Sequence, residues 1–179
     1  MSTTLSLVSE LERIARALET EDAGSSQPSL PAIAEKIAKT IGVRKEEVAI
    51  LAVSKRWKHL HFLVPEALKS VGFIPLSSNS ALAAKTVRES RPEIDNNFSA
   101  ARHAVVFENI RLSGESLDPI QKIISAPILF DGRVVGVIQI SRKGATSAKA
   151  GSDFTPEHLG NLLALCKPLG KFVHRAGGE

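Results

Sequence analysis

Two apolar runs separated by the dipeptide Asp131-Gly132 form the clearest pattern in this chain. Residues 122–130 read KIISAPILF and residues 133–141 read RVVGVIQIS, and both runs are apolar at nearly every position. Asp-Gly favours a two-residue type I′ turn, because both turn positions need a positive φ angle. The pattern therefore predicts a long β-hairpin whose sheet is covered on both faces.

A second hairpin is predicted earlier in the chain. Residues 46–54, EEVAILAVS, have the pattern of a mostly buried strand, and residues 59–64, HLHFLV, alternate along the next strand. The segment between them contains three basic residues and Trp57. Such a short basic segment is typical of a solvent-exposed hairpin tip, since charge alone gives only nonspecific attraction to nucleic acid.

Residues 65–120 are less regular. GFIPL at 72–76 predicts a short strand, and NSALAAKTVRES at 79–90 predicts a helix with Asn79 or Ser80 as its N-cap. RPEIDNNF at 91–98 is expected to form a turn. Residues 101–110 fit a helix or a strand equally well.

Amphipathic helices are predicted at both ends of the chain. Residues 3–20 form the first, and Gly24 and Pro28 mark a linker after it. Its apolar stripe consists of Leu7, Leu11, Ile14 and Leu18. A lone helix of this length is marginal in water, so the stripe needs a partner. That partner is either the terminal helix of the same chain or a second copy of the chain.

Two further helices are predicted from their caps. One begins near Ser29, with Pro31 in its first turn, and ends at Gly42. The terminal helix begins at Thr155-Pro156 and contains Pro168, which we expect to kink or weaken it. The apolar stripe of the terminal helix consists of Leu159, Leu162, Leu163, Cys166, Leu169 and Val173.

Composition fits a single packed domain. The chain has 179 residues, of which 43% are hydrophobic and 23% charged, with a net charge of +4. No apolar run reaches the roughly 20 residues of a membrane span, and the first residues lack the pattern of a secretory signal. One cysteine allows no intrachain disulfide. We expect a cytoplasmic protein without membrane contact, and we do not expect it to bind nucleic acid.

The order of these elements resembles a GAF domain over about residues 30–174. The segment SALAAKTVRESRPEIDN at 80–96 is similar to that family's helix followed by Arg-Pro. SAPILFDGRVVGVIQI at 125–140 resembles its long hairpin, and FTPEHLGNLLALCKPLG at 154–170 resembles its terminal helix. The resemblance implies an α+β, PAS-like fold with a central antiparallel sheet of five or six strands. Helices would cover one face of the sheet and irregular loops the other, with a small-molecule pocket beneath the loops.

The resemblance also implies an organisation of the chain. Residues 1–28 would be a dimerisation helix and linker, 29–175 the GAF-like domain and 176–179 a tail. A homodimer would form through the first and last helices. The dimer contacts are expected to come from Leu7, Leu11, Ile14, Leu18, Leu162, Cys166 and Leu169.

Departures from the family argue against several of its activities. Cyclic-nucleotide-binding members carry Asn-Lys after the hairpin and Asp-Glu after a later Phe. Ser141-Arg142 and His158-Leu159 stand at the matching positions here, and only the Phe is kept, as Phe154. Members that reduce methionine sulfoxide use reactive cysteines near the pocket, whereas Cys166 lies on an apolar helix stripe where a buried, inert thiol is expected. No cofactor is expected.

Ligand-binding candidates concentrate in the segment 91–107, where the resemblance places the pocket wall. Arginine offers a rigid donor fork, asparagine both donors and acceptors, and phenylalanine an apolar lining. Gln139 is the lone polar residue in GVIQI and is either a sheet-edge residue or a pocket floor. The candidates are Arg91, Asn96, Asn97, Phe98, Arg102, His103, Phe107 and Gln139. The alternative is that Asp95, Asn96 and Asn97 form a turn and that the basic residues face solvent.

Catalytic and metal sites find little support. His59 and His61 share a strand face, but no third ligand is evident, so we expect two ordinary strand histidines. No nucleophile lies beside a base, and no glycine-rich phosphate loop is present. The sequence therefore favours a non-catalytic sensory or regulatory domain that binds a small molecule and acts through dimer geometry or a partner signalling protein. The alternative is a ligand-free dimerisation or protein-interaction module.

Overall fold

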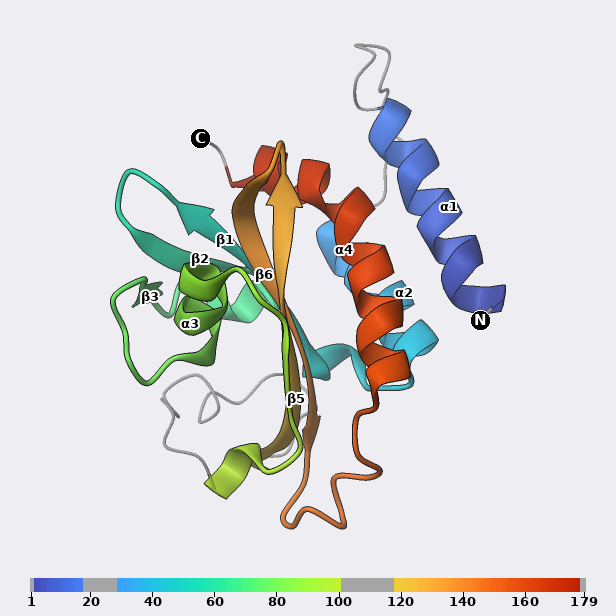
Figure 1. The fold of residues 1–179 in the computed structure, drawn as a ribbon, viewed down its shortest axis with the longest axis vertical. Coiled ribbons are helices and arrows are strands. Elements are labelled where there is room, and N and C mark those ends of the chain that lie inside the picture. The colour runs from blue at the N-terminus through green and yellow to red at the C-terminus, as the bar shows by residue number, and fades with distance from the viewer. Residues whose placement is uncertain (1, 18–28, 101–117, 178–179) are drawn as a thin grey trace.

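The computed structural model describes residues 2–17, 29–100 and 118–177. The predicted linker and the alternatives for 101–110 lie outside the described residues, as do Leu18, Arg102, His103, Phe107 and the side chain of Ile14. The described elements form one six-stranded antiparallel sheet with helices on both sides (Figure 1).

The long hairpin supplies two neighbouring strands inside the sheet, with β6 near its centre. Strand β5 (Ile120–Phe130) pairs with β6 (Arg133–Lys143), and Asp131 and Gly132 between them have φ angles of 50° and 73°. Both angles are positive, so the predicted turn is confirmed. The remaining strands are β1 (Val48–Ser54), β2 (His59–Val64), β3 (Phe73–Pro75) and β4 (Glu93–Asp95). The sheet order is β3-β2-β1-β6-β5-β4.

The first predicted hairpin is also confirmed, because β1 and β2 pair antiparallel. The turn between them, residues 55–58, is exposed throughout. Trp57 at this tip is 64% exposed, and the guanidinium of Arg56 lies 4.9 Å from its ring centroid.

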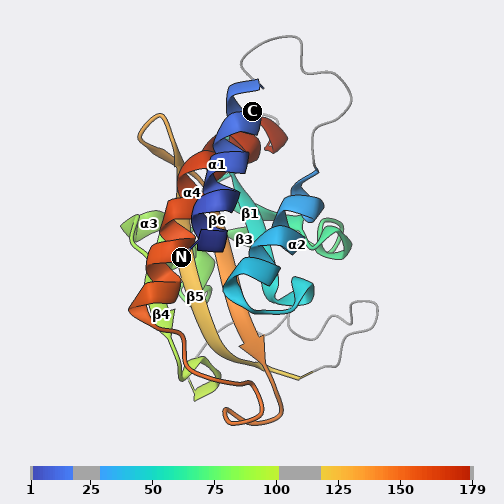
Figure 2. The same cartoon turned by 90° about the vertical axis from the view of Figure 1, so that its right-hand side faces the viewer.

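Two helices, α2 and α4, pack on one face of the sheet, and a third, α1, lies over them on the side away from the sheet (Figures 1 and 2). They are α1 (Ser2–Ala17), α2 (Leu30–Ile41) and α4 (Pro156–Ala176). Their apolar side chains join those of alternate strand residues, such as Ile138 and Ile140, in the larger hydrophobic core. The fourth helix, α3 (Leu82–Glu89), lies on the opposite face over a smaller core that contains Val137 and Phe62. The second face is therefore covered by a helix as well as by loops.

Local expectations were met in part. Ser29 caps α2, and Gly42 ends it with a φ angle of 86°. By contrast, residues 93–95, which we expected to form a turn, form the edge strand β4, because pairing with β5 satisfies their backbone groups. Neither Asn79 nor Ser80 caps α3: its N-cap is Ala81, whose backbone N–H donates to the Ser78 hydroxyl.

Pro168 does not interrupt α4, which continues as one helix from Pro156 to Ala176. The proline is buried with its neighbours Leu165 and Leu169 on the side of α4 that packs on β5 and β6. This packing offsets the backbone hydrogen bond that proline cannot make.

The described part of the α1 stripe, Leu7 and Leu11, is covered within the chain. These two side chains are 5% and 1% exposed and share the larger core with Leu162 of α4, while Glu10 of α1 pairs with Lys36 of α2. The partner of Leu7 and Leu11 is therefore the chain's own terminal helix. The expectation that these side chains face a second copy is corrected accordingly: Leu7, Leu11, Leu162, Cys166 and Leu169 are all buried in the single chain. Dimerisation itself stays a prediction.

Among the described residues, no helix combines the length and the hydrophobicity needed to cross a bilayer.

Replacing Leu11 with alanine should destabilise the protein because it opens a cavity between α1 and α4. We expect Leu11→Ala to lower the free energy of unfolding by about 2–5 kcal/mol. Leu5 lies on the same helix but is 63% exposed, so Leu5→Ala should change stability by less than about 0.5 kcal/mol. Urea denaturation of both variants measures the difference, and equal effects would contradict the packing of α1 on α4.

Candidate functional site

A cavity of about 360 Å³ lies on the α3 side of the sheet. Its floor is formed by side chains of β1, β2, β5 and β6, and its walls by β3, the start of α3 and residues of the segment 65–81. This volume falls within the usual range of small-molecule sites.

The cavity combines an apolar lining with a few polar groups. Its apolar surface includes Phe62, Leu68, Ile74, Ala83 and Phe98. Its polar side chains include Glu46, Glu47, Ser78, Gln139, Ser141 and Lys143. Such a mixture is typical of sites in which apolar contact provides affinity and a few polar groups fix orientation.

Gln139 on the cavity floor belongs to a buried hydrogen-bond chain. Thr86 Oγ1 donates to the carbonyl of Leu82 at 2.9 Å and lies 2.7 Å from Ser125 Oγ. Because the single Thr86 proton is already used, Ser125 must donate to Thr86. Gln139 Nε2 in turn donates to Ser125 Oγ at 3.2 Å. The chain fixes the Gln139 amide and joins β6, β5 and α3 beneath the cavity.

Glu47 is a buried carboxylate whose hydrogen bonds are satisfied by the protein. It accepts from the backbone N–H, Nε and Nη2 of Arg44 at 3.1, 3.0 and 2.7 Å, and from the backbone N–H of Lys143 at 3.2 Å. The Arg44 guanidinium compensates its charge. Glu47 therefore joins the start of β1 to the end of β6.

Arg88 fixes a loop beside the cavity. Its Nη1 donates to the carbonyls of Leu76 and Ser78 at 2.5 and 2.8 Å. These two bonds hold residues 76–78 against α3. The part of the cavity wall that Pro75 and Ser78 form is therefore attached to α3 through Arg88.

The structure brings together two of the predicted site residues, Phe98 and Gln139, which both line the cavity. Gln139 lies on the central strand β6, so of its two predicted positions the structure selects the pocket floor. Arg91 instead faces solvent, with its side chain 74% exposed and paired with Glu89 at 2.8 Å. Asn97 is exposed in a turn in which its backbone N–H donates to Asp95.

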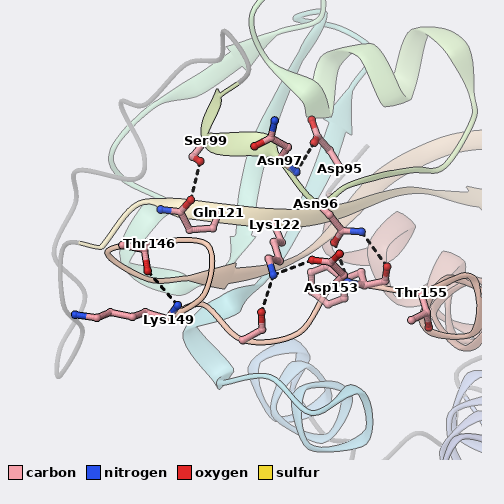
Figure 3. Close-up of polar contacts among 12 residues, drawn as sticks. Asp95, Asn96, Asn97, Ser99, Gln121, Lys122, Thr146, Lys149, Asp153 and Thr155 are labelled. Carbon is pink, nitrogen blue, oxygen red and sulfur yellow. Dashed lines mark hydrogen bonds and ion pairs between the residues drawn. The ribbon is translucent and has the colours of Figure 1, made fainter.

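Asn96 forms a contact between distant segments, outside the cavity lining. Its Nδ2 donates to the carbonyl of Phe154 at 3.0 Å, and its Oδ1 accepts from the N–H of Phe154 at 2.8 Å (Figure 3). These paired bonds hold the segment before α4 to the end of β4. Residues 96 and 97 form a turn directly after β4, and neither residue lines the cavity.

A buried lysine anchors the same segment to β5. Lys122 is 4% exposed, and its Nζ donates to the Gly151 carbonyl at 2.6 Å and lies 2.8 Å from Asp153 Oδ1 (Figure 3). Gln121 beside it accepts from Ser99 at 2.6 Å and donates to the Gly144 carbonyl at 2.9 Å. The polar groups of Lys122 and Gln121 find their hydrogen-bond partners within the protein, so we assign these two residues a structural role.

Several cavity residues were not among the sequence candidates. Ser141 and Lys143 lie two and four positions after Gln139 on β6, so all three face the same side of the sheet. This alternation along the strand is visible in the sequence and could have added Ser141 and Lys143 to the candidates. Glu46 and Ser78 had no comparable signal, because a short 3-10 helix and an irregular loop bring them to the cavity.

The strand histidines make ring contacts. The His59 ring stacks on Phe73 with centroids 4.5 Å apart, and His61 lies edge-on at 6.0 Å from His59. Across residues 2–17, 29–100 and 118–177, no three His, Cys, Asp or Glu side chains gather in an arrangement that would hold a metal.

The thiol of Cys166 is shielded from solvent. It is 5% exposed within the larger core, on the face of the sheet opposite the cavity. Burial raises its pKa to about 12, because the thiolate would lose hydration there. The neutral thiol is a poor nucleophile.

Comparison with known structures identifies the fold. No protein-family model matches the sequence, and no curated protein is significantly similar to it. The structure nevertheless resembles the GAF domain of a phosphoenolpyruvate-protein phosphotransferase from Acinetobacter, with a TM-score of 0.66 and 15% identity over 97% of this chain and 94% of that one. The corresponding GAF domain from Coxiella burnetii gives 0.65 and 11% identity over 99% and 97%.

A free methionine-R-sulfoxide reductase from Neisseria meningitidis is also similar, with a TM-score of 0.56 and 17% identity over 97% of this chain and 91% of that one. The chain therefore has the fold of a GAF domain, as the sequence resemblance implies. The GAF domain of a two-component sensor histidine kinase from Bacillus halodurans also has this fold, with a TM-score of 0.56 and 18% identity over 83% of this chain and 96% of that one, so the fold occurs in a sensor protein as well as in the reductase.

Asn96 should contribute to stability through its two bonds to Phe154. We expect Asn96→Ala to lower the free energy of unfolding by about 1–3 kcal/mol, because the Phe154 backbone loses its partner. The neighbouring Asn97→Ala removes an exposed side chain and should change it by less than about 0.5 kcal/mol. Chemical denaturation of both variants tests this, and an unaffected Asn96→Ala protein would contradict the assigned role.

Proposed function

We propose that this protein is a regulatory GAF-fold domain that binds a small molecule in the cavity under α3. The observation that carries this proposal is the cavity itself: about 360 Å³, mainly apolar, with polar groups on a rigid floor. Preformed, mixed cavities of this size are the usual sites of small ligands. The likeness to the GAF domain of a two-component sensor histidine kinase supports the same interpretation.

We further propose that the domain is not an enzyme. The reductase of similar fold raises the alternative of sulfoxide reduction. Such chemistry in this fold uses reactive cysteines near the pocket, and the sole cysteine, Cys166, is buried with a raised pKa on the other face of the sheet. A thiol in that position is poorly suited to attack a molecule in the cavity.

Transmission of a signal would use the close contact between the sheet and α4. A Cβ atom at Gly136 of β6 would overlap the Leu51 carbonyl and Val173 of α4, and one at Gly170 of α4 would overlap the Leu129 carbonyl of β5. Helix α4 and the sheet are therefore in close backbone contact at these two positions, which would couple a shift of one to the other. Binding at the cavity would shift α4 and with it α1, where the exposed Leu5 and Leu163 offer apolar contacts for a homodimer or a partner protein.

Ligand binding should appear as thermal stabilisation in a screen of nucleotides, amino acids and organic acids. A ligand at a hundred times its Kd adds about 2.7 kcal/mol to stability by mass action. Ala49 lines the cavity, so Ala49→Phe should abolish the stabilisation by filling the space, whereas Ala148→Phe on an exposed loop should leave it intact. Flat melting curves for every compound would favour the interaction-module alternative.

Cys166 should be unreactive in the folded protein. Its raised pKa keeps the thiol protonated well above neutral pH, and burial excludes reagents. We expect a chromogenic disulfide reagent to label it at pH 8 only after denaturation, and we expect no reduction of free methionine sulfoxide in the presence of dithiothreitol. Rapid labelling of the native protein, or turnover that Cys166→Ser abolishes, would contradict a non-catalytic role.

A further inference from the structure

We propose that the tip of the β1–β2 hairpin and the edge strand β3 together bind an acidic, extended segment of a partner protein. The β3 edge surface, as we call it, consists of residues 55–59 and 71–75. It lies on the side of the molecule away from α1, as Figure 1 shows. The inference goes beyond the proposed function, and it does not require a ligand in the cavity.

Exposed apolar side chains gather on the β3 edge surface. Of the six large hydrophobic residues that are exposed in the described part of the chain, Trp57, Val71 and Phe73 lie here, at 64%, 42% and 59% exposure. The His59 ring stacks on Phe73 with centroids 4.5 Å apart, and His59 follows Trp57 by two residues, a span of at most about 7 Å. Apolar side chains grouped in this way on a surface are typical of a binding site for another protein.

The same part of the chain is strongly basic. Residues 48–88 contain six basic residues and one acidic residue, so this stretch has a net charge of +5 in a chain whose total is +4. The one acidic residue, Glu66, lies 3.8 Å from Lys69. Arg56 and Lys58 at the hairpin tip are exposed, and neither forms an ion pair with another described residue. The charge of this surface therefore complements an acidic partner.

The outer side of β3 is open to a further strand. The Leu76 N–H donates to the Lys58 carbonyl at 3.0 Å, and hydrogen-bonded and non-hydrogen-bonded pairs alternate along an antiparallel ladder. Ile74 therefore directs its backbone groups toward β2, and Phe73 directs its N–H and carbonyl to the outer side. β3 is the last strand in the sheet order, and no other described strand pairs with that side. An extended segment can add to β3 through backbone hydrogen bonds at Phe73.

A protein segment fits this surface better than a nucleic acid does. Single-stranded nucleic acids bind by stacking bases on aromatic rings and by many phosphate contacts. Here the Arg56 guanidinium already lies over the Trp57 ring at 4.9 Å, and His59 already stacks on Phe73. The open backbone edge at Phe73 and the exposed Val71 suit a peptide, because a peptide supplies both backbone partners and apolar side chains. Its carboxylates would pair with the basic side chains of the hairpin tip.

The probe is a synthetic peptide in which Glu alternates with Val, and its counterpart carries Lys in place of every Glu. Calorimetric titration into the full chain at physiological ionic strength compares the two affinities. We expect the acidic peptide to bind about tenfold or more tightly, because its charges attract those of the surface and the lysines repel them. Amide NMR signals of residues 55–59 and 71–75 should shift, and hydrogen exchange of the Phe73 amide should slow as its N–H gains an acceptor.

Two matched pairs of variants locate the binding. Lys58→Glu should weaken the acidic peptide about tenfold, whereas Lys149→Glu, the same charge change on an exposed loop after β6, should weaken it less than about twofold because salt screens distant charges. Trp57→Ala should also weaken the peptide, whereas Leu5→Ala on α1, with a similar exposure of 63%, should leave the affinity unchanged. The comparison of the two peptides needs no variant, so the proposal stays testable if a variant fails to fold.

Equal binding of the two peptides would overturn the preference for an acidic segment, and equal losses in Lys58→Glu and Lys149→Glu would overturn the assigned surface. Tighter binding of a thymidine oligonucleotide of the same charge would overturn the choice of a protein partner. Absence of heat and of NMR shifts with the acidic peptide at millimolar concentration would overturn the inference as a whole. None of these outcomes bears on ligand binding in the cavity, so the proposed function is tested separately by the thermal screen.

Discussion

Burial of β5 and β6 on both faces is the constraint on which the other layers depend. The paired strands are each eleven residues long; β6 contributes side chains to both cores, and β5 contributes to the larger one. One face requires a broad apolar cover, which α2 and α4 provide, with α1 packed on them. The other face is covered by the smaller α3 and by loops, and this narrower cover leaves room for a cavity. The apolar central hairpin therefore accounts for both the helical layer and the hollow on the opposite side.

The same burial explains the polar architecture. A buried hydroxyl or amide on these strands needs a hydrogen-bond partner to offset its lost hydration. Ser125 and Gln139 form a hydrogen-bond chain with Thr86, and this chain ends at the Leu82 carbonyl of α3. The buried Glu47 carboxylate accepts hydrogen bonds from the Arg44 guanidinium at the end of the sheet. Among the described residues, Glu46 Oε2 and Arg142 Nε are the buried side-chain atoms that lack such a partner.

Most of the fold was predictable because it is governed by short-range signals. Asp131-Gly132 specified the central hairpin, Ser29 and Gly42 delimited α2, and alternation marked β1 and β2. The cavity was less predictable, because its walls come from segments without periodicity. Asn96 illustrates the difficulty: its amide could equally orient a ligand or bind backbone, and only the position of Phe154, 58 residues away, decides between them. Likewise, the partner of the apolar side chains of α1 could be predicted only with knowledge of which helix lies beside α1.

The exposed hairpin tip has a consequence for spectroscopy. Trp57 is the sole tryptophan, the chain contains no tyrosine, and its indole ring is 64% exposed beside the Arg56 guanidinium. Intrinsic fluorescence therefore originates at the outer end of one hairpin, in an environment that is already aqueous in the native state. Emission should therefore report little on the interior of the molecule. If Trp57 were replaced and a tryptophan were introduced at the cavity instead, that residue would report on the cavity with no competing signal.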